Sequence, residues 1–426
     1  MDFVTEKLSF AEWDLIRIFE NQYLFNYMKY SHMTSVCLIA LLLACSGKNE
    51  ITPPAPIEKQ AVVDTTAQVT TPQGPDEPGG NGGTGDTGVV IPEDAILVTN
   101  AYMEKYLEEV HYPEGDWSYS KILEYPGGGA NGVGDVPPTV TISWQPATTG
   151  TCKLTLTEGD WSREFSLKEG STSQDVTNLV PCRKYEWVVT ASDGSVVASD
   201  SFWTKGHLHQ VFFTKQARNA RDLGGWKTAD GKTVKFRKVF RGGKMSENYI
   251  DAAGIKDALA EGIRADLDLR EEGGMPSQSP LGKDIAFCGP GFLHGYQAMM
   301  EEPAKVKAAF EFVVNCLRED KPVYFHCAIG SDRTGTFSIL LLGILGVPEP
   351  DICKEYEITY FAPEKWSVTN GKVDRLRTNK SRYLQAIKYL LTYGSYKDFK
   401  ACVQSYLLKA GVSEKDINDF RTLMLE

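Results

Sequence analysis

The sequence is poor in histidine, and its cysteines lack the close spacing of metal ligands. Six histidines and nine cysteines are spread over 426 residues. Zinc sites in proteins use these two residue types at short, regular intervals. No such interval occurs here, so the sequence predicts no metal site.

Positive charge is scarce as well. Lys and Arg number 45 against 56 Asp and Glu, which gives a formal net charge of −11. Proteins hold nucleic acids with basic faces, so the charge argues against a nucleic-acid partner. A single small anion remains a compatible ligand, because backbone amides and one Arg suffice to bind it.

The apolar run at residues 33–44 is too short to span a bilayer, which takes about 20 residues. It suits the apolar core of a signal peptide, and its end at Cys45 resembles a bacterial lipobox, whose cysteine is lipidated. We expect residues 1–45 to hold an N-terminal extension and a lipoprotein signal peptide, with Met28 as the true start. The protein is then exported and anchored by lipid to a bacterial membrane, on the periplasmic or cell-surface side. A buried helix or a short anchor is the alternative interpretation.

Residues 46–91 are rich in Pro, Thr, Gly and Asp and poor in apolar side chains. Such a segment has no core to bury, so we expect a disordered linker. Residues 92–136 remain unassigned to a domain. Their pattern indicates a helix at 96–110, followed by strand-like stretches at 116–120 and 122–125.

Residues 137–205 change to short alternating strands separated by turns, a pattern typical of a β-sandwich. Trp144 on an early strand and Tyr185 after Leu-Val-Pro resemble the fibronectin type III pattern with its tyrosine corner. The resemblance implies a spacer or a docking surface. Cys152 and Cys182 are the only cysteines here, and the sequence leaves open whether they form a disulfide.

Residues 206–426 alternate strands with helices, which indicates an α/β domain whose mostly parallel sheet is covered by helices. The expected strands are 263–269, 284–288 and 323–326. The expected helices are 246–261, 303–317, 334–345, 352–360, 380–392, 396–409 and 413–424.

Residues 326–335 read His-Cys-Ala-Ile-Gly-Ser-Asp-Arg-Thr-Gly between two apolar runs. This pattern predicts a buried strand, a tight loop and a buried helix. Such a loop turns backbone N–H groups toward a bound anion. Cys327 would lie beneath the anion, in a positive field that lowers the pKa of its thiol, and Arg333 would bind two of the anion's oxygens. A thiolate in line with a bound phosphate predicts ester hydrolysis through a phosphocysteine.

The same ten residues resemble the active-site loop of the cysteine-dependent phosphatases, the protein tyrosine phosphatase superfamily. Three earlier stretches occur in the order of a bacterial tyrosine phosphatase family: Asn-Ala-Arg-Asp-Leu-Gly-Gly at 219–225, Phe-Arg at 240–241 and Asp-Leu-Arg at 268–270. That family has secreted members acting on phosphotyrosine and sometimes on phosphoinositides. We therefore expect residues 206–426 to form a tyrosine phosphatase-like domain, which needs no cofactor.

Each residue of the loop has an expected role. Cys327 is the nucleophile, and Arg333 binds the phosphoryl oxygens with its two-donor fork. Thr334 hydrogen-bonds the sulfur, and His326 orders the loop from beneath. The remaining contacts to the phosphoryl oxygens come from the main chain of Ala328, Ile329, Gly330 and Ser331.

The general acid is less evident, because the chain contains no Trp-Pro-Asp loop. Asp332 matches the family pattern and is the favoured candidate. Three other carboxyl groups compete with it: Asp222, Asp268 and Glu272. Arg241 and Arg270 are candidates for extending the anion site.

The substrate class depends on Ser331, which stands where the family usually has Lys. Losing that cation weakens the phosphoinositide interpretation and favours phosphotyrosine. Phosphoinositide or inositol phosphate hydrolysis stays open, as does a surface module that only binds phosphorylated ligands. The sequence makes no prediction about oligomeric state.

Overall fold

The computed structural model describes residues 90–113, 121–125, 135–213, 218–245, 250–271, 273, 276–363, 379–395 and 397–426. The expected signal peptide with Met28 and Cys45 lies outside these residues. So do residues 46–89 of the expected linker, residues 116–120 and Glu272.

A five-stranded sheet runs through the α/β domain in the order β11-β10-β12-β9-β8. The parallel strands are β9 (Val239–Gly242), β10 (Ala265–Asp268), β11 (Ala286–Cys288) and β12 (Val323–His326). The short edge strand β8 (Arg221–Asp222) is antiparallel to β9. All residues of β9, β10 and β12 are buried, as in sheets covered on both faces. The expected α/β class is confirmed, with β12 between β10 and β9.

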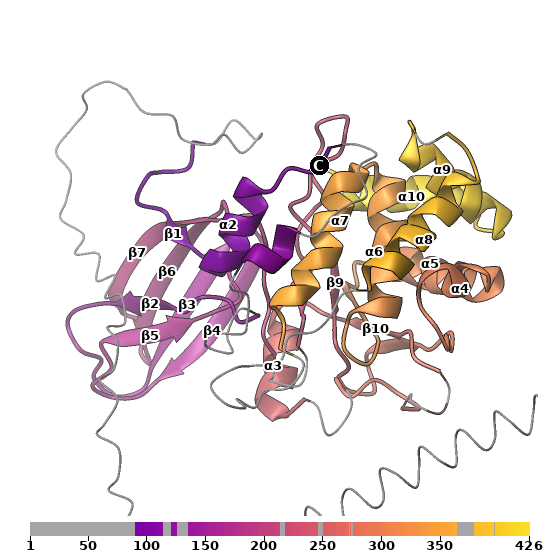
Figure 1. Cartoon of the computed structure of the whole chain (residues 1–426). Helices are drawn as coiled ribbons and strands as arrows, with labels where there is room; N and C mark the ends of the chain where they lie inside the picture. The colour runs from indigo at the N-terminus through magenta and orange to yellow at the C-terminus, as the bar shows by residue number, and fades with distance from the viewer. Residues whose placement is uncertain are drawn as a thin grey trace, which may run out of the picture. The chain divides into compact units, whose positions relative to one another are not determined.

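Helices cover this sheet (Figure 1). They are α3 (Ala252–Ala260), α4 (Tyr296–Met300), α5 (Pro303–Arg318), α6 (Asp332–Leu345), α7 (Glu349–Glu357), the 3-10 helix η3 (Ile358–Phe361), α8 (Lys380–Leu391), α9 (Phe399–Lys409) and α10 (Glu414–Met424). The sequence pattern missed α4, because five residues are too few to show a helical period.

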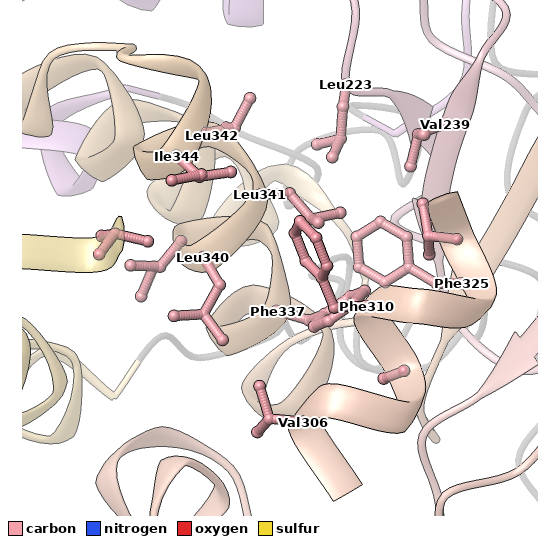
Figure 2. Packing of buried hydrophobic residues seen from close by; sticks show 14 of the residues in the cluster. Leu223, Val239, Val306, Phe310, Phe325, Phe337, Leu340, Leu341, Leu342 and Ile344 are labelled. Carbon is pink, nitrogen blue, oxygen red and sulfur yellow. The ribbon is translucent and has the colours of Figure 1, made fainter. Parts of the chain in front are cut away.

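Helix α6 is buried on all sides from Thr334 onward and lies inside the core. Every residue from Thr334 to Leu345 is buried. Figure 2 shows Phe337 and Leu341 of α6 in one cluster with Phe310 of α5 and Phe325 of β12. The Phe325 and Phe337 rings meet edge to face, with centroids 5.2 Å apart. This packing fixes the end of β12 against the start of α6.

The region around residues 137–205 is all β. One sheet has the order β1-β7-β6-β3-β4, and β2 pairs with β5. The strands are β1 (Ile96–Leu97), β2 (Val140–Ser143), β3 (Cys152–Glu158), β4 (Trp161–Leu167), β5 (Ser173–Val176), β6 (Lys184–Ala191) and β7 (Val196–Lys205). The Tyr185 hydroxyl accepts a 2.8 Å bond from the Val180 N–H, which is the contact of a tyrosine corner. Cys152 and Cys182 are free thiols.

The unassigned segment 92–136 contributes to both neighbours. Its β1 pairs in parallel with β7. Its helix α2 (Ala101–Glu109) packs with Ile358 and Phe361, and the Tyr106 hydroxyl donates a 2.8 Å bond to Glu357. The strand expected at 122–125 is wrong: Lys121–Glu124 is a 3-10 helix, η1. This turn buries Ile122 against the cluster that contains Tyr106.

The all-β region packs directly on the α/β domain. Trp161 donates a 2.9 Å bond to the Ala260 carbonyl at the end of α3. The Arg237 guanidinium lies over the Trp161 ring at 4.1 Å and pairs with Glu158 at 2.5 Å. Its Nη2 also donates to the Tyr185 hydroxyl at 3.2 Å. Through these contacts the all-β region forms an interface with the α/β domain. A flexible spacer would make few such contacts.

Candidate active site

The loop at residues 327–331 joins β12 to α6 at the carboxyl end of the parallel strands. Its glycine is required, because Gly330 has φ +73° and a Cβ there would lie 2.6 Å from the carbonyl carbon of Gly242. Gly242 is confined in turn, since its own Cβ would lie 2.1 Å from the Tyr324 hydroxyl. The loop is therefore pressed against the end of β9.

Cys327 lies at the base of this loop and is 2 % exposed. Burial by itself raises the pKa of the thiol, but opposing interactions outweigh it and the pKa is lowered. They are hydrogen bonds from the Thr334 hydroxyl and N–H, the charge of Arg333 and the Ile329 N–H. The Thr334 hydroxyl is buried and donates to no oxygen or nitrogen atom of the described residues, so its proton is available to the sulfur. These interactions favour the thiolate form of Cys327 beneath converging N–H groups.

Arg333 is held at the mouth of the loop by its Nη1 atom. Nη1 donates to Glu271 and, at 2.9 Å, to the Phe292 carbonyl. The bond to Arg333 also helps to keep the pKa of the Glu271 carboxyl low, after the bond from its own N–H. Nε and Nη2 bind no described residue, so two donors of the fork remain for an anion.

His326 lies at the end of β12, beneath the loop. Its Nδ1 lies 3.3 Å from the Cys327 carbonyl, and its Nε2 forms a 3.0 Å ion pair with Asp266 of β10. Burial lowers the pKa of this imidazole, but the Asp266 charge outweighs burial and raises it. With a proton on Nδ1, His326 donates to the carbonyl of Cys327.

A buried network holds the loop from below. The Asn219 carboxamide donates a 2.8 Å bond to the Gly330 carbonyl, and Arg241 donates to the same oxygen. Arg241 pairs with Glu355 at 2.9 Å, and Glu355 also accepts a 2.8 Å bond from Arg221. Burial, with the charge of Arg221, lowers the pKa of Arg241 to about 10. Arg241 has no exposed surface, so it supports the loop and does not extend the anion site toward solvent.

Arg270 and two of the candidate acids, Asp268 and Asp222, are engaged in ion pairs or hydrogen bonds within the protein. Arg270 is nearly buried and pairs with Asp268 at 2.6 Å. The Asp222 carboxylate accepts bonds from the Gly224 and Arg237 backbone N–H groups at 2.8 and 2.5 Å. Both carboxylates hold structure in these positions, and Glu272 lies outside the described residues.

Asp332 is the carboxyl group in the first turn of α6. Its Oδ1 accepts a 2.7 Å bond from the Tyr296 hydroxyl and a 3.2 Å bond from Ser331 Oγ. Ser331 is fully buried, so this position adds neither a charge nor a side chain to the rim.

Sequence reasoning missed the partners of the loop, namely Glu271, Tyr296 and Glu355. Glu355 had a readable signal, since a carboxylate in the buried helix α7 requires a cationic partner. Tyr296 had none.

One group of residues within the described ranges could hold a metal ion: Glu104, Glu108 and His207. Glu104 uses both carboxylate oxygens on His207, at 2.9 Å to its N–H and 2.8 Å to Nδ1. None of the three belongs to the catalytic loop.

Comparison with known proteins places residues 213–426 in a family described as the tyrosine phosphatase family. A protein of Cupriavidus necator, whose name assigns it to the tyrosine-protein phosphatases, is 29% identical over 162 residues, 32% of this chain and 59% of that protein. A tyrosine-protein phosphatase of Nostoc commune is 31% identical over 127 residues, 24% of this chain and 43% of that protein. The chain spans about half the length of these curated relatives.

Proposed function

The chain belongs to the tyrosine phosphatase family, and we propose that it hydrolyses phosphate monoesters, foremost phosphotyrosine, through a phosphocysteine on Cys327. One observation carries this proposal. The Thr334 hydroxyl, two backbone N–H groups and Arg333 all lower the pKa of one buried thiol at the start of α6. A binding module has no need of a thiolate, so this arrangement favours turnover.

The reaction proceeds in two displacements. The Cys327 sulfur attacks phosphorus and forms the S–P bond while the P–O bond to the leaving group breaks. Asp332 gives its proton to the departing oxygen. Water then attacks phosphorus and passes a proton to Asp332, and the S–P bond breaks. The Thr334 hydroxyl stabilises the departing thiolate, and Arg333 with the loop N–H groups stabilises the charge on the phosphoryl oxygens in both steps.

The distribution of cations supports an aryl phosphate over a phosphoinositide. Holding several phosphates on one ring takes more than one cation at the rim. Ser331 is buried and uncharged, Arg241 is buried against Glu355, and Arg270 is paired with Asp268. Arg333 also pairs with Glu271, but its Nε and Nη2 still bind no described residue and can hold one phosphoryl group. Phosphoinositide hydrolysis is the second candidate, favoured only by what the family resemblance implies.

Phosphate release by the full chain tests the proposal. Phosphotyrosine peptides, phosphoserine peptides and short-chain phosphoinositides are compared, with Cys327→Ser as the control. Turnover mainly on phosphotyrosine and none by Cys327→Ser is expected. Turnover mainly on inositol lipids would show that the substrates are phosphoinositides and not phosphotyrosine. Binding of phosphopeptides without turnover by either protein would leave only a binding module.

We also propose that the protein is exported, that its Cys45 is lipidated and that residues 137–205 are a fibronectin type III-like domain. The lipobox-like end of the apolar run supports the first two parts, and the Tyr185–Val180 contact supports the third. No helix among the described residues is long and apolar enough to cross a membrane. Labelling of growing bacteria with a fatty acid tests the anchor, since Cys45→Ser is expected to remove the label and release the protein from membranes.

A further inference from the structure

Helix α4 begins directly against the first turn of α6. Tyr296 has φ +61°, a left-handed value that is uncommon for a bulky residue. A Cβ on the preceding Gly295 would lie 2.8 Å from the carbonyl carbon of Asp332 and 2.9 Å from the amide nitrogen of Arg333. Only glycine permits this approach. The start of α4 is thus fitted to the two residues that follow the catalytic loop.

Tyr296 binds this turn with both its backbone and its side chain. Its N–H donates to Thr336 Oγ1 at 2.6 Å, and Thr336 Oγ1 donates to the Asp332 carbonyl at 2.8 Å. Its hydroxyl donates to Asp332 Oδ1 at 2.7 Å. One residue therefore fixes both the backbone and the carboxyl group of Asp332.

A second tyrosine fixes the direction of these bonds. The Tyr356 hydroxyl lies 2.6 Å from that of Tyr296 and accepts a 2.9 Å bond from the Asn379 N–H. Burial raises the pKa of both phenols, so both keep their protons at neutral pH. Because the amide can only donate, the Tyr356 proton is free to point to Tyr296, and that of Tyr296 points to Asp332.

Both donors to Asp332 meet on one oxygen. Ser331 Oγ also donates to Oδ1, at 3.2 Å, whereas Oδ2 binds no residue in the described part of the chain. We infer that Tyr296, supported by Tyr356, is a positioning residue that leaves Oδ2 of Asp332 to carry the proton for the leaving group. The inference rests on the proposed function, because it requires Asp332 to be the general acid.

The test is a series of aryl phosphates whose leaving phenols differ in pKa, measured with the full chain as kcat/KM. A general acid matters most for a poor leaving group. Asp332→Asn is therefore expected to lose roughly 10²-fold or more on phenyl phosphate and little on an activated nitrophenyl ester. Tyr296→Phe is expected to lower kcat/KM about 10-fold on phenyl phosphate and to change it by less than about 2-fold on the nitrophenyl ester. The double variant with Asp332→Asn is expected to be no slower than Asp332→Asn alone.

Tyr106→Phe is the matched control, since it removes another buried hydroxyl that donates to a carboxylate, at 2.8 Å. It is expected to leave the dependence on leaving group unchanged. If Tyr296→Phe does not fold, Tyr356→Phe serves instead, with a smaller loss of the same pattern expected. A uniform loss over all esters, or no loss, overturns the inference while the phosphatase stands. Absence of turnover in the unmodified protein overturns the proposed function itself.

Discussion

The carboxamide of Asn219 donates a 2.8 Å hydrogen bond to the carbonyl of Gly330, so a residue 111 positions earlier in the chain holds the catalytic loop. Both residues have positive φ, +58° and +73°. The carbonyl bound below leaves the N–H groups of the loop free to face the anion above it. The shape of the anion site thus depends on a residue that does not touch the substrate.

Asn219→Gly keeps the left-handed backbone and removes the carboxamide. We expect it to lower kcat/KM by at least about 10-fold and stability by about 1–3 kcal/mol, because the buried Gly330 carbonyl loses a partner. Asn178→Gly is the control, since Asn178 is also buried, has φ +62° and lies in the all-β region. It is expected to cost stability alone, and an equal loss of activity in both variants would contradict the role of Asn219.

Arg333→Lys tests the fork at the mouth of the site. Lysine keeps the charge but cannot donate two parallel bonds to a phosphoryl group. We expect kcat/KM to fall roughly 10³-fold, in the range of arginines that stabilise phosphoryl transfer, and inhibition by inorganic phosphate to weaken. Arg318, which is exposed and pairs with Asp416 and Asp419, supplies the control. Arg318→Lys should change neither kcat/KM nor the inhibition by phosphate. Full activity of Arg333→Lys would show that the loop amides alone bind the phosphate.

The lowered pKa of Cys327 predicts how its reactivity depends on pH. Because the pKa lies below that of an ordinary thiol, alkylation by iodoacetamide should already be fast near neutrality and slow only under more acidic conditions. Thr334→Ala removes the hydroxyl that helps to lower the pKa, so its alkylation curve should move to higher pH. Thr334→Ser keeps the hydroxyl and should stay near the original curve. Coincident curves for all three proteins would exclude the hydroxyl as a cause.

Oxidation offers a separate test of the nucleophile. A thiolate reacts with hydrogen peroxide to a sulfenic acid, which thiol reductants reverse. Brief treatment should abolish phosphatase activity, dithiothreitol should restore it, and bound phosphate should protect it. Cys316 has a pKa raised to about 11, mainly by burial, so Cys316→Ser should leave the inactivation rate unchanged. Activity that survives peroxide without any reductant would contradict the role of Cys327.

The Trp161 contact predicts that the all-β region and the α/β domain unfold together. Trp161→Ala removes the bond to Ala260 and the ring under Arg237, and we expect it to lower stability by about 2 kcal/mol. The Cys327 thiol should then become accessible at a lower temperature. Trp187, which contacts Trp144 within the all-β region, is the control. Two separate unfolding transitions in the unmodified protein would refute the coupling.

The sequence predicted the bounds of an element best where a motif of reactive residues adjoins a run of apolar residues. The bounds of β12 were predicted as the structure has them, because Val323–His326 is apolar up to the motif. The start of α6 was placed at Thr334, two residues late, since Asp332 and Arg333 carry no apolar period. The strand expected at 122–125 was wrong: Lys121–Glu124 is a 3-10 helix, which buries Ile122 and leaves Leu123 exposed.

The partners of charged residues were the least predictable part. Arg241 was a candidate for extending the anion site, yet its partner Glu355 lies 114 positions later in the chain. Nothing local in the sequence separates a buried arginine from an exposed one. Tyr296 was invisible for the same reason, because its role depends on Asp332 and Tyr356, 36 and 60 positions away. The residues that hold the loop are therefore harder to predict from the sequence than the residues of the loop itself.

The position of α2 has an evolutionary consequence. Tyr106 and its neighbours pack on Ile358 and Phe361, while β1, a few residues earlier, completes the sheet of β7. The segment that precedes the all-β region is thereby packed against the α/β domain and paired with the all-β sheet. Recombination that exchanged residues 137–205 for an unrelated module would remove the contact of Trp161 with Ala260 and leave Arg237 without Glu158. We therefore expect this region to be inherited together with its catalytic domain and not as an interchangeable cassette.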